Sequence, residues 1–257
     1  MADQREFTRQ FAAAGSVVAE GVLAPDFIVS AKQQLEMAQE AEVRYHGTHD
    51  FKDYGMVLLC ALYGGAFWSV FDNPRLMGPF NAVLGDGCIV YSYTSSSMPP
   101  GGINYSGRIH TDCPRIVPGY VTNMGATILL DDFTEENGAT WYLPNSHLRE
   151  DAPEERYFYE HARRVIAPAG SAWFFNARTW HAGGVNRSAR WRHAITINMV
   201  RPWMKQRIDI PRALSQSNLD ELSPAARQKL GFDAQVPASY DEYYAPLEQR
   251  TYKQKTE

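Results

Sequence analysis

The sequence predicts a mostly β fold with flanking α-helices, whose core is a double-stranded β-helix of the jelly-roll, cupin-like type. Apolar residues recur at three-to-four spacing in the first third of the chain, for example at 26–41 and 74–84, which is typical of amphipathic helices. From Gly87 onward, short β-branched and aromatic runs alternate with clusters of Gly, Pro, Asn and Asp. That pattern favours many short antiparallel strands, and helices followed by strands favour a rolled sheet braced by helices.

A chain of 257 residues has the length of one large domain with a substantial core. We therefore expect residues 1–257 to form a single domain with three consecutive parts. Residues 1–86 are expected to be mainly helical support, and residues 87–201 the jelly-roll core. Residues 202–257, which are charged and end in a Tyr-rich polar segment, are expected to add C-terminal helices and a tail.

Seven segments of the core are predicted strands, because their β-branched and aromatic residues are bounded by turn formers. These segments are 88–94, 107–111, 123–131, 139–143, 163–167, 171–175 and 191–200. Successive side chains of a strand point to opposite faces. In 191–200 one face is bulky and the other carries Arg192, Thr196 and Asn198; in 123–131 the small and polar face includes Gly125 and Thr127. We expect these two polar faces to line a pocket.

Composition argues against several classes of function. The formal net charge is −4, and Lys and Arg are scattered, which argues against nucleic acid and anionic membranes as partners. The start, MADQREFTRQ, lacks a following apolar stretch, and no run is long enough for a spanning helix. Cys60, Cys88 and Cys113 are too widely spaced for a CxxC site. We therefore expect a cytoplasmic protein with a small-molecule substrate; the oligomeric state is left open.

Two histidines and one aspartate form a candidate metal site. His110 and Asp112 are two residues apart in the segment RIHTD (108–112), so on a strand they would point to the same side. His181 would join them from another strand. Two imidazoles and one carboxylate on one face of an octahedral ion leave three adjacent positions open, as non-haem iron(II) oxygenases require. An H-x-D triplet alone is common by chance, so the surrounding sequence must show whether this one belongs to a metal site.

That context consists of three further motifs in a fixed order. An acidic pair, Asp131-Asp132, is followed by NGATWYLPNSH at 137–147 and then by WHAGGVNRS at 180–188, with Arg192 on the next strand. In order, spacing and strand context these motifs resemble the phytanoyl-CoA dioxygenase family of iron(II)/2-oxoglutarate enzymes. The resemblance spans about residues 88–201.

The sequence departs from the family pattern at two positions. Asn145 stands where the family often has Gly, and Gly183 stands where some members have a hydroxyl residue that helps bind the cosubstrate. The second departure leaves one contact to 2-oxoglutarate unassigned.

The resemblance implies that His110, Asp112 and His181 hold Fe(II) and form the catalytic centre, with 2-oxoglutarate as cosubstrate and O₂ as oxidant. Related halogenases have a small apolar residue in place of Asp112, so the carboxylate favours oxidation without halide transfer. We expect hydroxylation of a small organic molecule, with succinate and CO₂ as products; desaturation and cyclisation remain open. A natural-product intermediate is preferred to an acyl-CoA, because the chain lacks a basic patch for the CoA phosphates.

The resemblance also implies cofactor-binding residues. Arg192 would grip the distal carboxylate of 2-oxoglutarate, for which a guanidinium offers a planar, bidentate fork. Arg187 and Arg190 are competing cations. Thr127 lies at a position that resembles a cosubstrate contact of the family, and Thr94, on a polar strand face before the metal motif, is a further candidate.

Two other functions fit the same barrel. A hydrolase or isomerase would use zinc or another divalent ion and a metal-bound water, which would leave Arg192 without a role. A non-catalytic, cupin-like metal-binding or sensor protein would keep the pocket without turnover. Among the remaining histidines, His147 is expected to form structural hydrogen bonds, and His193 to face away from the metal because its strand parity is opposite to that of Arg192.

Overall fold

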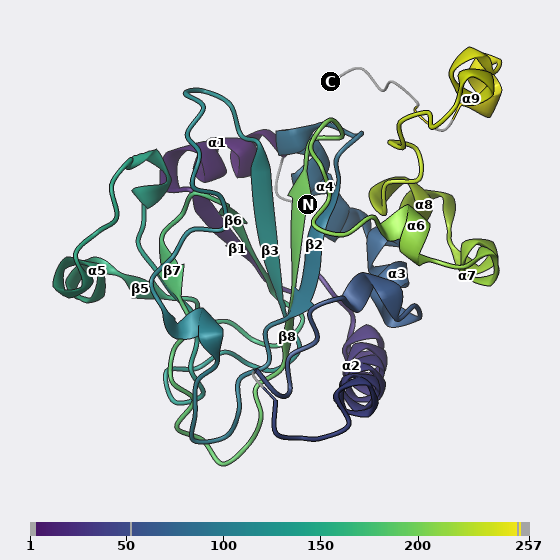
Figure 1. Cartoon of the computed structure of the whole chain (residues 1–257). Helices are drawn as coiled ribbons and strands as arrows, with labels where there is room; N and C mark the ends of the chain where they lie inside the picture. The colour runs from purple at the N-terminus through teal and green to yellow at the C-terminus, as the bar shows by residue number, and fades with distance from the viewer. Residues whose placement is uncertain (1–3, 52, 251, 253–257) are drawn as a thin grey trace.

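A five-stranded antiparallel sheet forms the centre of the computed structural model, which describes residues 4–51, 53–250 and 252 (Figure 1). Its strand order is β1-β6-β3-β8-β2. The strands are β1 (Ser16–Ala19), β6 (Ala172–Asn176), β3 (Asn123–Leu129), β8 (Ala194–Val200) and β2 (Ile89–Ser95). A second antiparallel sheet has the order β5-β4-β7, with β5 (Arg163–Arg164), β4 (Trp141–Tyr142) and β7 (His181–Ala182).

Helices lie on the outside of the main sheet. Four precede β2: α1 (Gln4–Ala14), α2 (Pro25–His46), α3 (Ala66–Ser69) and α4 (Pro74–Leu84). The others are α5 (Glu155–His161), α6 (Ile210–Ala213), α7 (Gln216–Glu221), α8 (Pro224–Lys229) and α9 (Tyr240–Tyr244). In Figure 1, α2 and α3 lie on one side of the main sheet, and the small sheet with α5 lies on the other. None of the described helices combines the length and apolar character needed to cross a bilayer.

The predicted helices are found, and one was predicted to the residue. α4 spans 74–84 as expected; it begins with a proline, and the Asn73 side chain accepts hydrogen bonds from two first-turn backbone amides. α2 is longer than the predicted 26–41 and ends at His46, because the following Gly47 caps it in the left-handed conformation with φ 71°.

The predicted mostly β composition is wrong, because helices cover more of the described chain than strands do. Residues 1–86 also contribute β1, a strand that the sequence did not indicate. β1 has only four residues, too few for a periodic signal, and pairs with β6 through the register Val17↔Phe174. The pairing with β6, rather than local propensity, makes this segment a strand.

Six of the seven predicted strand segments contain a strand, and most are shorter than predicted. The predicted strand 107–111 is wrong. A 3₁₀ turn, η3 (Tyr105–Gly107), in which the Asn104 side chain accepts from the Ser106 amide, ends only at the first residue of this segment. His110 then makes only an isolated bridge to His181. The extended stretch between the turn and His110 is therefore too short for a ladder of several pairs.

The predicted division of strand faces is confirmed for β3 and β8. Their bulky side chains belong to one buried apolar cluster with residues of α1, α2 and α4. The opposite faces carry Thr127, Thr196 and Asn198, which line a cavity. The main sheet therefore separates a dry, helix-covered core from a polar pocket.

Gly125 allows an aromatic ring to lie flat against the pocket side of β3. A Cβ at this position would be 2.2 Å from the Phe175 ring, which is buried and stacks on Trp173 with centroids 4.3 Å apart. We expect Gly125→Ala to lower the free energy of unfolding by about 1–3 kcal/mol through overpacking, measured by chemical denaturation. Gly78→Ala in α4, where the nearest atom is 3.5 Å away, is the control and should be neutral or stabilising. Equal effects of the two changes would contradict this account.

Candidate metal centre

The three predicted ligands converge from separate parts of the chain. One ligand atom from each of His110, Asp112 and His181 lies within 4.8 Å of the other two. The Asp112 Oδ1 atom is 3.6 Å from His110 Nε2 and 3.9 Å from His181 Nε2. Two reciprocal backbone hydrogen bonds, each 2.9 Å, join His110 to His181 and fix the spacing of their rings.

The hydrogen bonds of the two imidazoles define which nitrogen is free. His110 Nδ1 is 2.7 Å from the Arg108 carbonyl oxygen, and His181 Nδ1 is 2.9 Å from the Thr179 carbonyl oxygen. A carbonyl oxygen only accepts, so each Nδ1 carries the proton and donates it. Each ring therefore presents its Nε2 atom to Asp112 Oδ1.

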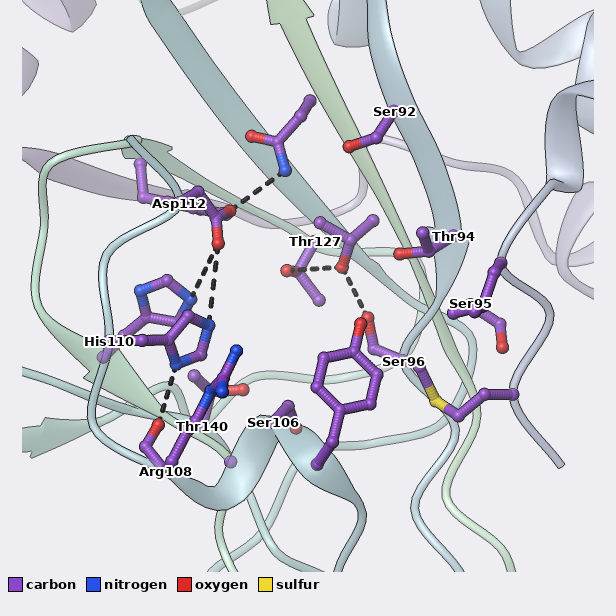
Figure 2. A pocket seen from close by; sticks show the side chains of 18 of the residues that line it. Ser92, Thr94, Ser95, Ser96, Ser106, Arg108, His110, Asp112, Thr127 and Thr140 are labelled. Atoms are coloured by element: carbon purple, nitrogen blue, oxygen red, sulfur yellow. Dashed lines mark hydrogen bonds and ion pairs between the residues drawn. The ribbon is translucent and has the colours of Figure 1, made fainter. Parts of the chain in front are cut away.

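Asp112 is oriented by a residue that sequence reasoning did not assign. The Asn198 side-chain amide donates a hydrogen bond of 3.0 Å to Asp112 Oδ2, which leaves Oδ1 directed at the imidazoles (Figure 2). Asn198 is buried, and its own Oδ1 has no hydrogen-bond partner among the described residues. The signal was present in the sequence, because Asn198 shares strand parity with Arg192 and therefore faces the pocket.

Burial keeps the His110 imidazole neutral. Desolvation is the largest cause that lowers the pKa of His110, to about 4, and the neighbouring His181 lowers it further; Asp112 opposes both. At neutral pH the ring is therefore uncharged and its Nε2 lone pair is available to a cation.

The centre opens into a cavity of about 480 Å³, within the range of about 300–1,000 Å³ that is common for small-molecule sites. The wall facing the ligands is rich in hydroxyl groups. Figure 2 shows Ser92, Thr94, Ser96 and Thr127 across the cavity from His110. Aromatic rings close the other wall, where the Phe175 ring lies 5.1 Å from the His181 ring. The cavity thus offers both polar and apolar contacts beside the candidate metal ligands.

Arg192 lines the same cavity and is only 2% exposed. Its guanidinium donates to the carbonyl oxygens of Gly138 and Ser96, while Nε is buried without a hydrogen-bond partner among the described residues. Burial lowers the pKa of Arg192 to about 9, although Asp131 raises it. Arg192 is thus a desolvated cation. Two of its nitrogens donate to backbone carbonyl oxygens, but no carboxylate of the described residues forms an ion pair with it. The competing cations Arg187 and Arg190 are exposed and do not line the cavity.

The two predicted threonine contacts also lie at the cavity. Thr94 and Thr127 line it, and Thr127 Oγ1 is 3.0 Å from Thr196 Oγ1, which in turn is 2.5 Å from Ser96 Oγ. Sequence reasoning had not assigned Thr196 or Ser96 as contacts. A connected row of hydroxyls can rotate its protons to suit either a donor or an acceptor.

The two glycine-rich motifs shape the backbone around Arg192. Gly138 has φ 80°, and a Cβ there would lie 2.5 Å from the Gly184 carbonyl oxygen. The glycine lets two loops approach closely, so that the Gly138 carbonyl reaches Arg192. Asn186 is buried and ties the second loop together by donating to the carbonyl oxygens of Met98 and Arg190.

The departures from the family pattern have structural counterparts. Asn145 adopts φ 62°, a left-handed conformation that Asn tolerates better than most residues other than Gly. At Gly183, a Cβ would lie 2.6 Å from Ser106 Oγ, so the Ser106 hydroxyl fills that side of the cavity.

Two other histidines behave as predicted. His147 is buried, and its Nε2 is 3.2 Å from the Ala12 carbonyl oxygen, a structural hydrogen bond between the 137–147 motif and α1. His193 faces away from the cavity, with Nδ1 3.0 Å from Ser97 Oγ.

The role of Asn198 is testable by metal binding. We expect Asn198→Ala to weaken Fe(II) affinity by about 10- to 100-fold, because the amide that orients Asp112 is lost. Equilibrium titration of the ion under nitrogen measures the effect. Ser92→Ala is a matched control, since Ser92 lines the same cavity and pairs with Asn198 in the sheet register. Equal affinities for Asn198→Ala and the wild type would remove this role from Asn198.

This chain is similar to a known protein family, to two further proteins and to a solved structure. The model of the family described as phytanoyl-CoA dioxygenase (PhyH) matches residues 11–194. An uncharacterised protein of Mycobacterium bovis is 29% identical over 247 residues, which cover 93% of this chain and 90% of that protein. The dioxygenase andF of Emericella variicolor is 30% identical over 103 residues, 40% of this chain and 35% of that protein. The solved structure of the epimerase SnoN with Fe³⁺, alpha ketoglutarate and nogalamycin RO has a TM-score of 0.60 at 17% identity, covering 77% of this chain and 84% of SnoN.

Proposed function

Because the chain belongs to the phytanoyl-CoA dioxygenase family, we propose that it is an iron(II)- and 2-oxoglutarate-dependent oxygenase that oxidises a small organic molecule. His110, Asp112 and His181 are the proposed metal ligands, and Arg192 is the proposed partner of the distal carboxylate of 2-oxoglutarate. Thr127 and Thr94 are proposed as further cosubstrate contacts.

One observation carries the proposal of a metal. Two imidazole lone pairs and a carboxylate oxygen face one another at 3.6 and 3.9 Å, and both ring protons are held on the far nitrogens by carbonyl groups. Without a proton between them, these three groups repel one another. A cation bound among His110, Asp112 and His181 removes that repulsion, and two nitrogens with one carboxylate are the donor set that suits Fe(II).

The surroundings of Arg192 support a dicarboxylate cosubstrate. A buried guanidinium without a carboxylate bound to it is costly, and Arg192, whose Nε has no hydrogen-bond partner among the described residues, lines the cavity. A carboxylate that accepts from this fork would be both desolvated and bidentate, which makes the contact strong and directional. The hydrolase alternative gives no role to this buried charge.

The protein's part in the reaction is to bind, orient and exclude water. When bound, iron and 2-oxoglutarate supply the oxidation of an unactivated carbon by O₂. Asn198 holds Asp112 Oδ2, so that one carboxylate oxygen faces the ion. Phe175 and Trp173 pack beside His181, with Trp173 centroid 5.7 Å from that ring, and keep this side of the site apolar. The hydroxyl row of Thr127, Thr196 and Ser96 remains available to orient bound groups.

We further propose that the two antiparallel sheets form the double-stranded β-helix of a single domain, with the cavity between them. The pairing of β4 with β7 brings His181 into the small sheet, whereas Thr127, Thr196 and Asn198 come from the main sheet. This arrangement supports a jelly roll in which both layers contribute to one site.

Hydroxylation is the proposed outcome for the substrate, and the substrate is proposed to be a natural-product intermediate. The epimerase SnoN shares the fold and was solved with nogalamycin RO, so the same scaffold also carries chemistry other than hydroxylation. Analysis of the oxidised product separates hydroxylation from epimerisation, desaturation and cyclisation.

Succinate release tests the proposed function. The protein is incubated with a panel of natural-product intermediates while Fe(II), 2-oxoglutarate and O₂ are each omitted in turn or Fe(II) is replaced by zinc. We expect succinate only when all three are present, and more of it with a suitable intermediate. Turnover of a panel compound with zinc and without 2-oxoglutarate would favour a hydrolase or isomerase. Binding of the metal and 2-oxoglutarate with no succinate would favour a sensor.

A further inference from the structure

Positive charge at the cavity exceeds what the proposed metal and cosubstrate use. The described lining contains three arginines, Arg108, Arg192 and Arg207, and two aspartates, Asp53 and Asp112. Arg192 is assigned to 2-oxoglutarate and Asp112 to the metal. Two positive charges, on Arg108 and Arg207, and one negative charge, on Asp53, therefore remain. These three residues and Tyr105 are exposed or half-buried where the cavity meets solvent, and we call the four of them the mouth.

The two mouth arginines have no partners of their own. Within residues 4–51, 53–250 and 252, neither the Arg108 nor the Arg207 guanidinium makes an ion pair or a hydrogen bond. Among the described residues Asp53 forms no ion pair with either guanidinium; its Oδ1 atom accepts from the Tyr105 amide at 3.3 Å, and its single charge balances only one of the two cations. Their donors are thus free for a ligand.

Both arginines extend from anchored backbone. The Arg108 carbonyl oxygen accepts from His110 Nδ1 at 2.7 Å, which ties it to the metal centre. The Arg207 amide donates to the Tyr91 carbonyl oxygen at 2.9 Å, and the adjacent Gln206 side chain donates to Val90. The two cations therefore start from fixed points on the lining of one cavity.

Tyr105 links the mouth to the metal centre. Burial is the largest cause that raises the pKa of Tyr105; Asp112 and Asp53 raise it further, and Arg207 and Arg108 lower it. Both mouth cations and the candidate metal ligand are therefore within electrostatic reach of one side chain. A molecule held at the mouth can place a carbon beside the metal without spanning a second cavity.

We infer that the substrate carries an anionic group, a carboxylate or a phosphate, which Arg108 and Arg207 bind at the mouth while the rest of the molecule extends toward the metal. The chain as a whole has a net charge of −4 and repels anions, so a local pair of unpaired cations is a selective feature. The inference rests on the proposed function, because that function assigns Arg192 to 2-oxoglutarate.

Calorimetric titration of protein loaded with Fe(II) and saturating 2-oxoglutarate under nitrogen tests the inference. The probes are octanoate, octyl phosphate and octanol, which share one chain and differ in the end group; saturating 2-oxoglutarate keeps them from Arg192. We expect at least one of the two anions to bind about tenfold more tightly than octanol, and Arg108→Gln with Arg207→Gln together to abolish that difference. Arg190→Gln removes an exposed charge outside the cavity and should preserve it.

Whichever of octanoate and octyl phosphate binds more tightly identifies the anionic group of the substrate as a carboxylate or a phosphate. Equal affinities for the three probes, binding of none of them, or an unchanged preference in the double variant would overturn the inference. Succinate release by the wild type is measured in parallel. Its dependence on Fe(II), 2-oxoglutarate and O₂ tests the proposed function, whereas the preference for anionic probes tests the inference about the mouth.

Discussion

Replacing Asp112 with Ala is expected to abolish oxidation and to weaken Fe(II) binding by more than about 100-fold. Loss of an outer hydrogen-bond partner already costs about 10- to 100-fold in metal affinity, and Asp112 is the charged ligand itself in the proposed centre. His110 and His181 would remain as two neutral donors with no anion to balance the ion. Equilibrium titration with Fe(II) under nitrogen and assay of succinate measure the two effects.

Asp151→Ala is the matched control for this prediction, because Asp151 is an exposed aspartate outside the cavity. It should leave both Fe(II) affinity and succinate release at wild-type values. Retention of iron-dependent turnover by Asp112→Ala would remove Asp112 from the proposed metal site.

Replacing Arg192 with Gln is expected to weaken 2-oxoglutarate binding by about 30-fold or more. Removing one partner of a buried, hydrogen-bonded charge pair costs about 2–5 kcal/mol, and each 1.4 kcal/mol corresponds to about tenfold in affinity. Gln keeps a polar end but loses both the charge and the fork. Titration of 2-oxoglutarate into the Fe(II)-loaded protein without O₂ gives the affinity directly.

Fe(II) affinity measured without 2-oxoglutarate is the internal control for Arg192→Gln and should not change. Arg190→Gln controls for the loss of one positive charge nearby. Arg192→Lys should fall between the wild type and Arg192→Gln, because Lys keeps the charge without the bidentate geometry. A wild-type 2-oxoglutarate affinity in Arg192→Gln would assign the distal carboxylate to another cation.

Strand parity predicted much of the site. Arg192 was placed inward because it shares a face with Thr196 and Asn198, and the structure has all three at the cavity. The same reasoning placed His193 on the opposite face, where it contacts Ser97. Parity is reliable in β8 because β3 pairs with it in a continuous antiparallel register, so a shift by one residue would bury the polar face. Arg192 lies just before β8, and an isolated bridge to Met98 keeps it in the same alternation.

His110 and Asp112 were expected to lie together because alternate residues of a strand share one face, and that reason was wrong. These residues do not lie on a strand; His110 makes an isolated bridge, and Asp112 lies in a bend. They converge because the His110 backbone is tied to His181 and the Asp112 side chain is tied to Asn198, and both ties span long stretches of sequence. Contacts of that kind are set by tertiary packing and leave no local periodic signal.

The relative amounts of helix and strand also could not be predicted from local sequence patterns. Short β-branched and aromatic runs predicted seven strands, yet β4 and β5, which form in the predicted segments 139–143 and 163–167, have two residues each. Irregular backbone takes up the rest of these two segments; Ala167, for example, makes only an isolated bridge to Phe133. The ends of such strands depend on tertiary pairing, which propensity averaged over a window does not resolve.

A crystal structure of the protein grown under nitrogen with Fe(II) and 2-oxoglutarate, with the iron located by its anomalous signal, would show whether these residues bind both. We expect one iron peak per chain, bound by Nε2 of His110, Nε2 of His181 and Oδ1 of Asp112, with the far carboxylate of 2-oxoglutarate on Arg192. An iron peak away from these three atoms, or 2-oxoglutarate bound without contact to Arg192, would contradict this expectation.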